Sequence, residues 1–346
     1  MKELIKKLSD MRGISGFEYR ITDEITKLFK PVCDEVYTDA LGNLIAVKKC
    51  GKQEAKKVMI EAHCDEIGLM VKDIDENGFL SVVNVGGVDP RILPSSEVIV
   101  HGKRDIKGVV GAKPPHIQAS GEDKKSSKLT DMAVDTGLTF DEVKEIVSVG
   151  DSITFSQSTG ELMSGQFSGK SLDDRASIAA VITVLENLEK VKLNVDVYAV
   201  IAVKEEVGGF GAMTATYEIN PDIAVAIDVC HGITPDNSDN AFEVGNGVVV
   251  TCGPNIHPKI YNRLMDTAKE YNIKTEVEVE GGNTGTDAWA MQVVRNGIPT
   301  GLLSLPLKYM HTSVETISIS DVKAVSDLLT FFIQNLDDNM EGWLCL

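Results

Sequence analysis

The stretch "VDVYAVIAV", residues 195–203, is a valine-rich apolar run that ends at a charged segment. A run of this kind is typical of a β-strand that is buried on both faces. Comparable runs follow at "IAVAIDV" (223–229), "NGVVVTC" (246–252) and "IPTGLLSL" (298–305). All four are bounded by Gly, Pro or charged residues, which indicates separate strands.

The segments between these runs have apolar residues spaced three and four apart, which predicts helices. They are "DDRASIAAVITVLENLEK" (173–190), "PKIYNRLMDTAKEYN" (258–272) and "DAWAMQVVRN" (287–296). Near the start of the chain, "NLIAVKK" (43–49) and "KVMIEAH" (57–63) add two strands of the same style. Buried strands separated by helices predict an α/β fold with a mixed, mainly parallel sheet flanked by helices.

The segment 67–165 has a different pattern. "LMVKDIDENGFLSVVNVGG" (69–87), "SEVIVHG" (96–102) and "IKGVVGAK" (106–113) are short alternating strands with Gly- or Asn-rich turns. Such strands indicate a small antiparallel barrel or sandwich. We therefore predict a discontinuous α/β domain of residues 1–66 and 166–346, with residues 67–165 inserted as a second, β-rich domain.

Composition excludes several classes of partner. The formal net charge of −18 argues against nucleic acid and anionic membranes, because both need clustered Lys and Arg. No apolar run approaches the roughly 18–20 residues that a membrane span requires. The N-terminus is interpreted as an amphipathic helix and not as a signal peptide. Six cysteines without a C-x-x-C pair indicate reduced thiols in a cytoplasmic protein.

Ionisable residues gather just after the strands, and in open α/β sheets ligands bind outside the carboxyl ends of the strands. Each residue also has an ordinary explanation, as a solvated histidine, a helix cap or a turn former. Five chain segments nevertheless deliver such groups to one edge of the predicted sheet. The candidates are His63 with Asp65, Asp173, Glu205 with Glu206, Asp228, and His311.

Converging carboxylates repel one another unless protons or cations neutralise them. Imidazole and carboxylate ligands together suit zinc or cobalt, with manganese as a third option. The candidates exceed the three protein ligands of a mononuclear catalytic zinc site, so we predict two divalent cations that share a carboxylate. Asp65 lies two residues after His63, on the same side of an extended chain, and can orient its ring. Of the glutamate pair, one can bind metal while the other acts as a base.

Six motifs in this order resemble the dinuclear metalloaminopeptidases that form tetrahedral TET particles. They are "AHCDEIG" (62–68), "SLDDR" (171–175), "KEEVGGFGA" (204–212), "AIDV" (226–229), "GGNTGTDA" (281–288) and "YMHTSVE" (309–315). That family is also called glutamyl or deblocking aminopeptidase, and some members carry an older endoglucanase name. The resemblance spans essentially the whole chain.

The resemblance implies a role for each candidate. His63 and Asp228 would bind one metal, Glu206 and His311 the other, and Asp173 would bridge them. Glu205 would be the general base, and Asp65 would orient His63. The resemblance also implies short peptide substrates and homodimers, formed through the inserted domain, that assemble into a dodecamer.

Two other functions stay open from sequence alone: a glycoside hydrolase that uses Glu205 with another carboxylate, and a non-catalytic metal-binding assembly protein. Aromatic residues make up only 5% of the chain, whereas carbohydrate sites commonly use aromatic platforms. His116, in "AKPPHIQ", is interpreted either as a packing residue or as a histidine that approaches the site. His231 is given no role, and the N-terminal residue that the site prefers is left open.

Overall fold

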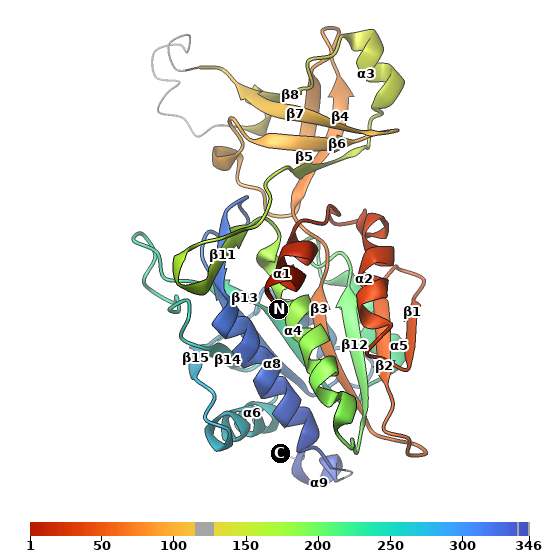
Figure 1. Ribbon diagram of the computed structural model, residues 1–346, viewed down its shortest axis with the longest axis vertical. Helices are drawn as coiled ribbons and strands as arrows, with labels where there is room; N and C mark the ends of the chain where they lie inside the picture. Colours follow the sequence, from red (N-terminus) through yellow and green to blue (C-terminus); the bar gives the residue numbers. More distant parts are fainter. Residues whose placement is uncertain (115–127, 338, 345–346) are drawn as a thin grey trace.

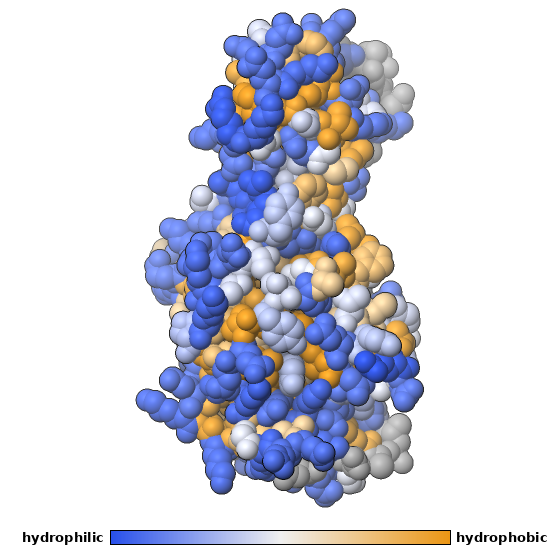
Figure 2. Space-filling view, turned by 90° about the vertical axis from the view of Figure 1, so that its right-hand side faces the viewer, coloured by the Kyte–Doolittle hydropathy of each residue, from blue (hydrophilic) through white to orange (hydrophobic). Residues whose placement is uncertain are grey.

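The computed structural model describes residues 1–114, 128–337 and 339–344. Figure 1 shows a helix-covered sheet in its lower part and a β-barrel above it. The chain leaves the sheet after strand β3 to build the barrel and then returns to the sheet. Figure 2 shows the side of the molecule, where hydrophilic residues cover most of the surface of both parts.

The large sheet has eight strands in the order β1-β2-β12-β3-β13-β16-β14-β15. The four central strands β12, β3, β13 and β16 run parallel, while β1–β2, β2–β12 and β14–β16 are antiparallel pairs. This confirms the expected mixed, mainly parallel sheet. The strands are β1 (Glu35–Thr38), β2 (Leu44–Lys48), β3 (Lys57–His63), β12 (Asp196–Ala202), β13 (Ile223–His231), β14 (Val248–Cys252), β15 (Thr275–Val279) and β16 (Thr300–Leu307).

Helices cover both faces of this sheet, and the apolar runs in the strands are buried between them. Residues of α1, α2, α4, α6 and α8 share one core cluster with the sheet, and residues of α5 and α7 share a second cluster on its other side. The helices are α1 (Lys2–Ser9), α2 (Thr22–Phe29), α4 (Leu172–Asn187), α5 (Phe210–Ile219), α6 (Pro258–Glu270), α7 (Asp287–Met291), α8 (Ile319–Gln334) and the C-terminal α9 (Met340–Leu344).

One helix is shorter than expected. The spacing in residues 287–296 predicts a helix over the whole segment, but α7 ends at Met291. Arg295 and Gly297 have φ values of 55° and 95°, in the left-handed region, which a right-handed helix cannot continue through. The apolar spacing of the segment therefore continues past Met291, where helix α7 ends.

The upper part is a closed barrel in the order β4-β5-β8-β7-β6-β9, with neighbouring strands antiparallel, which confirms the predicted antiparallel β-structure. Its strands are β4 (Gly68–Ile74), β5 (Leu80–Val85), β6 (Glu97–His101), β7 (Asp105–Ala112), β8 (Met132–Asp135) and β9 (Ser152–Phe155), with α3 (Phe140–Ile146) beside them. A small sheet follows, formed by β10 (Gly160–Glu161), β11 (Gln166–Gly169) and β17 (Glu315–Ser318). Within the described ranges, every helix is too short or too polar to cross a bilayer.

Candidate metal centre

The carboxyl ends of the central strands bring the candidate residues to one edge of the large sheet. In the parallel pair of β3 and β12, His63 lies opposite Ala202, so the segment with Glu205 and Glu206 follows directly beside it. β13 carries Asp228 near its end, and β16 leads into the turn with His311. Asp173 lies in the first turn of α4. The structure therefore brings these side chains together at one edge of the sheet.

The carboxylate of Asp173 lies between two imidazole rings. Its Oδ1 is 3.2 Å from Nε2 of His63, and its Oδ2 is 3.5 Å from Nε2 of His311. Oε1 of Glu206 lies 3.3 Å from the same Nε2 atom of His311. One carboxylate that faces two rings with separate oxygens is the arrangement that a ligand shared by two cations requires.

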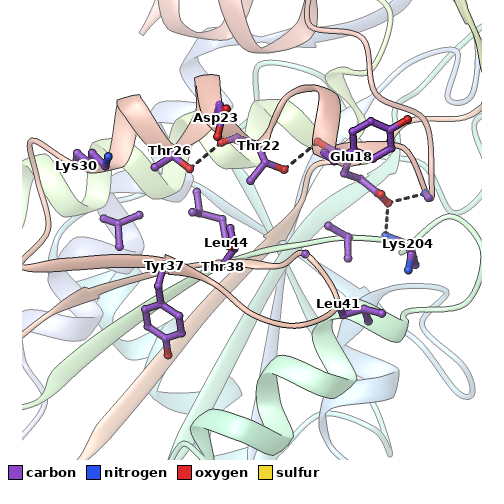
Figure 3. A pocket seen from close by; sticks show the side chains of 15 residues that line it. Glu18, Thr22, Asp23, Thr26, Lys30, Tyr37, Thr38, Leu41, Leu44 and Lys204 are labelled. Carbon is purple, nitrogen blue, oxygen red and sulfur yellow. Dashed lines mark hydrogen bonds between the residues drawn. The ribbon is translucent and has the colours of Figure 1, made fainter. Parts of the chain in front are cut away.

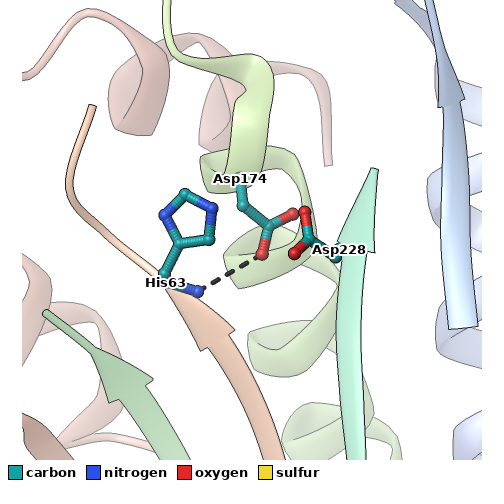
Figure 4. A group of neighbouring side chains, drawn as sticks. All are labelled: His63, Asp174 and Asp228. Atoms are coloured by element: carbon teal, nitrogen blue, oxygen red, sulfur yellow. Dashed lines mark hydrogen bonds between the residues drawn. The ribbon is translucent and has the colours of Figure 1, made fainter. Parts of the chain in front are cut away.

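A second group of donors lies on the other side of His63. Ligand atoms of His63, Asp174 and Asp228 all lie within 4.8 Å of one another, and so do those of His63, Asp173 and Glu206. In Figure 4 the carboxylates of Asp174 and Asp228 face each other above the end of β3. Asp174 Oδ2 accepts a hydrogen bond of 3.3 Å from the His63 backbone N–H, while its buried Oδ1 has no partner among the described residues. The sequence analysis assigned no ligand role to Asp174, although it lies beside Asp173 in "DDR".

Asp65 is completely buried and contacts both neighbouring segments. Its carboxylate accepts hydrogen bonds from Ser15 Oγ at 2.5 Å and from the backbone N–H groups of Glu205 and Glu206 at 3.1 and 3.2 Å. Its Oδ1 lies 3.5 Å from Nδ1 of His63, and its backbone oxygen is 3.2 Å from the same nitrogen. Burial raises the pKa of Asp65, but the contacts with His63 and Ser15 outweigh it, and the net pKa lies below its usual value. Asp65 thus contacts the ring and also holds the glutamate segment in place.

A second carboxylate holds the glutamate segment from its other side. Glu18 accepts hydrogen bonds from the backbone N–H groups of Gly16 and Lys204, at 2.8 and 3.0 Å. These bonds lie in a cavity of about 470 Å³ between α2 and β1, which Figure 3 shows with its lining side chains. Lys204 has a φ of 61°, in the left-handed region. The two buried carboxylates therefore fix the turn that presents Glu205.

Glu315, on β17, was also missed as a positioning residue. Its Oε1 accepts from the backbone N–H of His311 at 3.0 Å, and its Oε2 accepts from that of Asp173 at 3.2 Å. One buried carboxylate therefore links two segments that carry predicted ligands. Its only signal in the sequence is its place in "YMHTSVE", four residues after the histidine.

Glu205 lies at the open side of these groups, with Oε2 4.0 Å from Nε2 of His63. Burial, followed by the nearby charges of Asp228, Asp287 and Glu206, raises the pKa of Glu205 to about 10. Burial and like charges also raise the pKa of Asp174 and Asp228. These shifts have the same two causes, burial of the carboxyl groups and their closeness to one another.

The donor set fits divalent cations. Burial lowers the pKa of His311, but contacts with Asp173 and Glu206 outweigh this effect and raise it to about 11. A cation beside the His311 ring would interact with the same two carboxylates. Imidazole nitrogens and carboxylate oxygens are ligands that zinc and related metals accept, and the unpartnered Oδ1 of Asp174 offers a further donor.

The centre opens into a cavity of about 510 Å³. Its lining includes the carboxylates of Asp173, Glu205, Glu206 and Asp228, the ring of His311, and residues Thr284, Gly285 and Thr286 of the loop 281–288. His231 also lines the cavity, whereas His116 lies outside the described residues. The volume is sufficient for a small ligand such as the end of a peptide.

Known proteins resemble this chain over nearly its full length. The profile of the M42 glutamyl aminopeptidase family matches residues 42–328. A lysyl aminopeptidase from Pyrococcus furiosus is 37% identical over 340 residues, which cover 96% of this chain and 97% of the relative.

Two solved structures share the fold throughout. An aminopeptidase from the archaeon Desulfurococcus kamchatkensis has a TM-score of 0.89 at 34% identity, with 99% of this chain and 96% of that chain covered. The TET1 peptidase of Pyrococcus horikoshii, which can assemble into a tetrahedron or a large octahedral shell, has a TM-score of 0.86 at 32% identity, with 97% and 99% covered. The resemblance noted in the sequence is thereby confirmed, and the chain belongs to the M42 glutamyl aminopeptidase family.

Proposed function

We propose that this protein is a metal-dependent aminopeptidase that removes N-terminal residues from short peptides. The observation that carries the proposal is the Asp173 carboxylate between the rings of His63 and His311, with Glu205 beside them at the cavity. His63 and Asp228 would hold one divalent cation, and Glu206 and His311 the other. Asp173 would contribute one oxygen to each, and Asp174 is a further donor for the first.

Each remaining group has a separate task in peptide hydrolysis. Held by these residues, two divalent cations would supply a water of lowered pKa and a polarised substrate carbonyl. The Glu205 carboxylate accepts a proton from the attacking water and later donates it to the nitrogen of the leaving amine. Burial raises the pKa of Glu205 to about 10, and nearby positive charge would lower it toward the range that a general base needs. Asp65 keeps Glu205 and the His63 ring in position through the hydrogen bonds described above.

The test is the variant Glu205→Gln, which keeps the size of the side chain but removes the base. We expect two metal equivalents to remain bound while kcat falls by about 10²–10⁴-fold, the range for loss of a general base. Glu218→Gln, an exposed position on α5, is the matched control and should retain full activity. Unchanged turnover in Glu205→Gln, or loss of its metals, would contradict the assigned role.

Zinc and cobalt are the ions that we propose, with manganese as a third option, because the ligands combine imidazole and carboxylate. Chelation followed by add-back of each ion, assayed on aminoacyl chromogenic substrates, tests this. Activity that survives complete chelation would exclude a metal-dependent peptidase. Cellulose hydrolysis under the same conditions would favour the glycoside hydrolase, which needs two carboxylates but no histidines at the strand ends.

We also propose that residues 1–66 and 166–346 form the catalytic domain and that residues 67–165 form an inserted assembly domain. The closed barrel between Gly68 and Phe155 supports this division. By analogy with the TET1 peptidase, homodimers would assemble into a dodecamer that encloses the sites and restricts entry to short peptides. Light scattering should then give the mass of twelve chains, and a monomer would contradict the assembly.

A cytoplasmic location is proposed as well. Cys33, Cys50, Cys64, Cys230 and Cys252 are all free thiols. Free thiols are typical of proteins in a reducing compartment. Fractionation of the native host should find the protein with cytoplasmic markers.

A further inference from the structure

The wall of the cavity formed by the edge strand carries two acids that the metal centre does not use. Glu278 lies in β15, the outermost strand of the large sheet, and pairs with Thr251 of the neighbouring β14. Glu280 follows just after that strand ends. Both residues line the 510 Å³ cavity together with the proposed metal ligands and Glu205.

Both carboxylates are held in place, but their charges are not neutralised. Glu278 Oε2 accepts a hydrogen bond of 2.7 Å from Thr251 Oγ1, and Glu280 Oε1 accepts one of 3.0 Å from the Gly282 backbone N–H. These donors are neutral. Within residues 1–114, 128–337 and 339–344, no ion pair joins either glutamate to a lysine, arginine or histidine.

The charge of the cavity shows what this wall would attract. Among the described residues that line it are six carboxyl groups and no lysine or arginine. Two divalent cations would carry four positive charges, and the proposed carboxylate ligands Asp173, Asp174, Glu206 and Asp228 alone would balance them. Glu278 and Glu280 would then remain as a negative pair, exposed to whatever enters the cavity.

Apolar groups also line this cavity. Val229, Cys230 and Met310 are among its lining residues. A long cationic side chain can pack its methylene groups against such a surface while its charged end reaches a carboxylate. An acidic side chain in the same place would meet two like charges and no cationic partner from the described lining.

We propose that Glu278 and Glu280 form a specificity wall that selects an N-terminal lysine or arginine. This inference rests on the proposed aminopeptidase function, because it places the first residue of the substrate in the same cavity. The wall acts on the side chain, whereas the metal centre acts on the peptide bond. The two can therefore fail separately.

The experiment compares lysyl, arginyl, norleucyl and glutamyl 4-nitroanilides on the full-length, metal-loaded protein. Norleucine has the methylene chain of lysine without its ammonium group, so the lysyl-to-norleucyl ratio of kcat/KM isolates the charge. Two partly exposed ion pairs are expected to give a ratio of about tenfold. The ratio should fall as ionic strength rises, because salt screens exposed charges.

The double variant Glu278→Gln with Glu280→Gln removes the charge and preserves the shape. Its lysyl-to-norleucyl ratio of kcat/KM should approach one, because the wall then carries no charged partner for the lysyl ammonium group. Glu276→Gln is the matched control: this acid lies on the same strand, binds Asn246 Nδ2 and does not line the cavity. It should keep the full lysyl preference.

Three results would overturn the specificity wall: a wild-type ratio near one, a preference for the glutamyl substrate, or a ratio that survives in the double variant. If no aminoacyl substrate is cleaved after metal loading, the proposed function fails instead. Calorimetric titration of Glu205→Gln with lysinamide and norleucinamide then tests the wall without turnover. Tighter binding of lysinamide that is lost when Glu278→Gln and Glu280→Gln are added to Glu205→Gln supports the wall, and equal binding of the two amides refutes it.

Discussion

Replacement of Asp65 by Asn tests how the strand-end segments are held together. Oδ1 of Asp65 receives the Glu205 N–H and faces Nδ1 of His63, while Oδ2 receives Ser15 Oγ and the Glu206 N–H. An amide has one acceptor oxygen and one NH₂ donor group. If the oxygen stays on the Ser15 side, the NH₂ group points at the Glu205 N–H, donor against donor.

The size of the effect follows from these contacts. One orphaned buried N–H costs about 1–3 kcal/mol of unfolding free energy. Loss of the carboxylate near the His63 ring is expected to weaken metal binding about 10–100-fold, as for other groups that orient ligating histidines. A displacement of Glu205 by about 1 Å would lower kcat by about 10²-fold. We therefore expect a modest loss of stability and a large loss of activity.

The measurements are urea denaturation at saturating zinc, kcat on an aminoacyl chromogenic substrate, and zinc affinity by competition with a chelating dye. Ser15→Ala is the matched control, because it removes one donor to Asp65 but leaves the charge and the Glu205 bond. It should cost about 1 kcal/mol and change kcat by less than about threefold. If Asp65→Asn keeps wild-type kcat and zinc affinity, Asp65 does not position Glu205 and the His63 ring as proposed.

Three further outcomes are expected. In Gly87→Ala the new Cβ would lie 2.5 Å from Nδ1 of His311, so the ring must move and metal titration should show one weakened site; Gly160→Ala, with no atom within 4 Å of its Cβ, should bind both metals normally. Asp173→Asn removes the charge between the two rings, and metal analysis after dialysis should find at most about one equivalent. In the metal-free protein, the pKa values of Glu205 and His311, about 10 and about 11, lie above their usual 4.5 and 6.5. The folded state then binds more protons than the unfolded state, so denaturation should show stability falling as pH rises from about 5 to about 10, and zinc should reduce this slope. A metal-free protein that gains stability over this range would contradict the proposed charge balance.

Part of the fold follows from local patterns. The run 195–203 contains the buried strand β12, and the run 223–229 lies within β13. Strand period and burial depend on neighbouring residues along the chain, so they can be predicted without knowing the tertiary contacts. The same reasoning overestimated α7, because the left-handed backbone at Arg295 is not visible in the apolar spacing.

The candidate site shows a similar division. The alternation of strands and helices in the sequence indicates parallel pairing. Parallel pairing in turn places the groups that follow β3, β12, β13 and β16 at one edge of the sheet. The sequence does not indicate whether Asp173 or Asp174 faces the His63 ring. This depends on how the first turn of α4 packs against the end of β3. Glu315 accepts a hydrogen bond from Asp173, which lies 142 positions away in the chain, and no local sequence pattern predicts such a pair.

The amino-acid sequence alone determined the α/β class, the β-rich segment and the edge at which chemistry-bearing residues gather. These features depend on hydrophobic periodicity and on the points where strands end, both of which are local properties of the chain. Only the tertiary structure decided that Asp174 and Glu315 join the site and that Glu278 faces the cavity. Those facts depend on strand register and on the direction of side chains in segments that are distant in the chain. In the sequence, a glutamate of a solvated edge strand cannot be distinguished from a glutamate that lines a cavity.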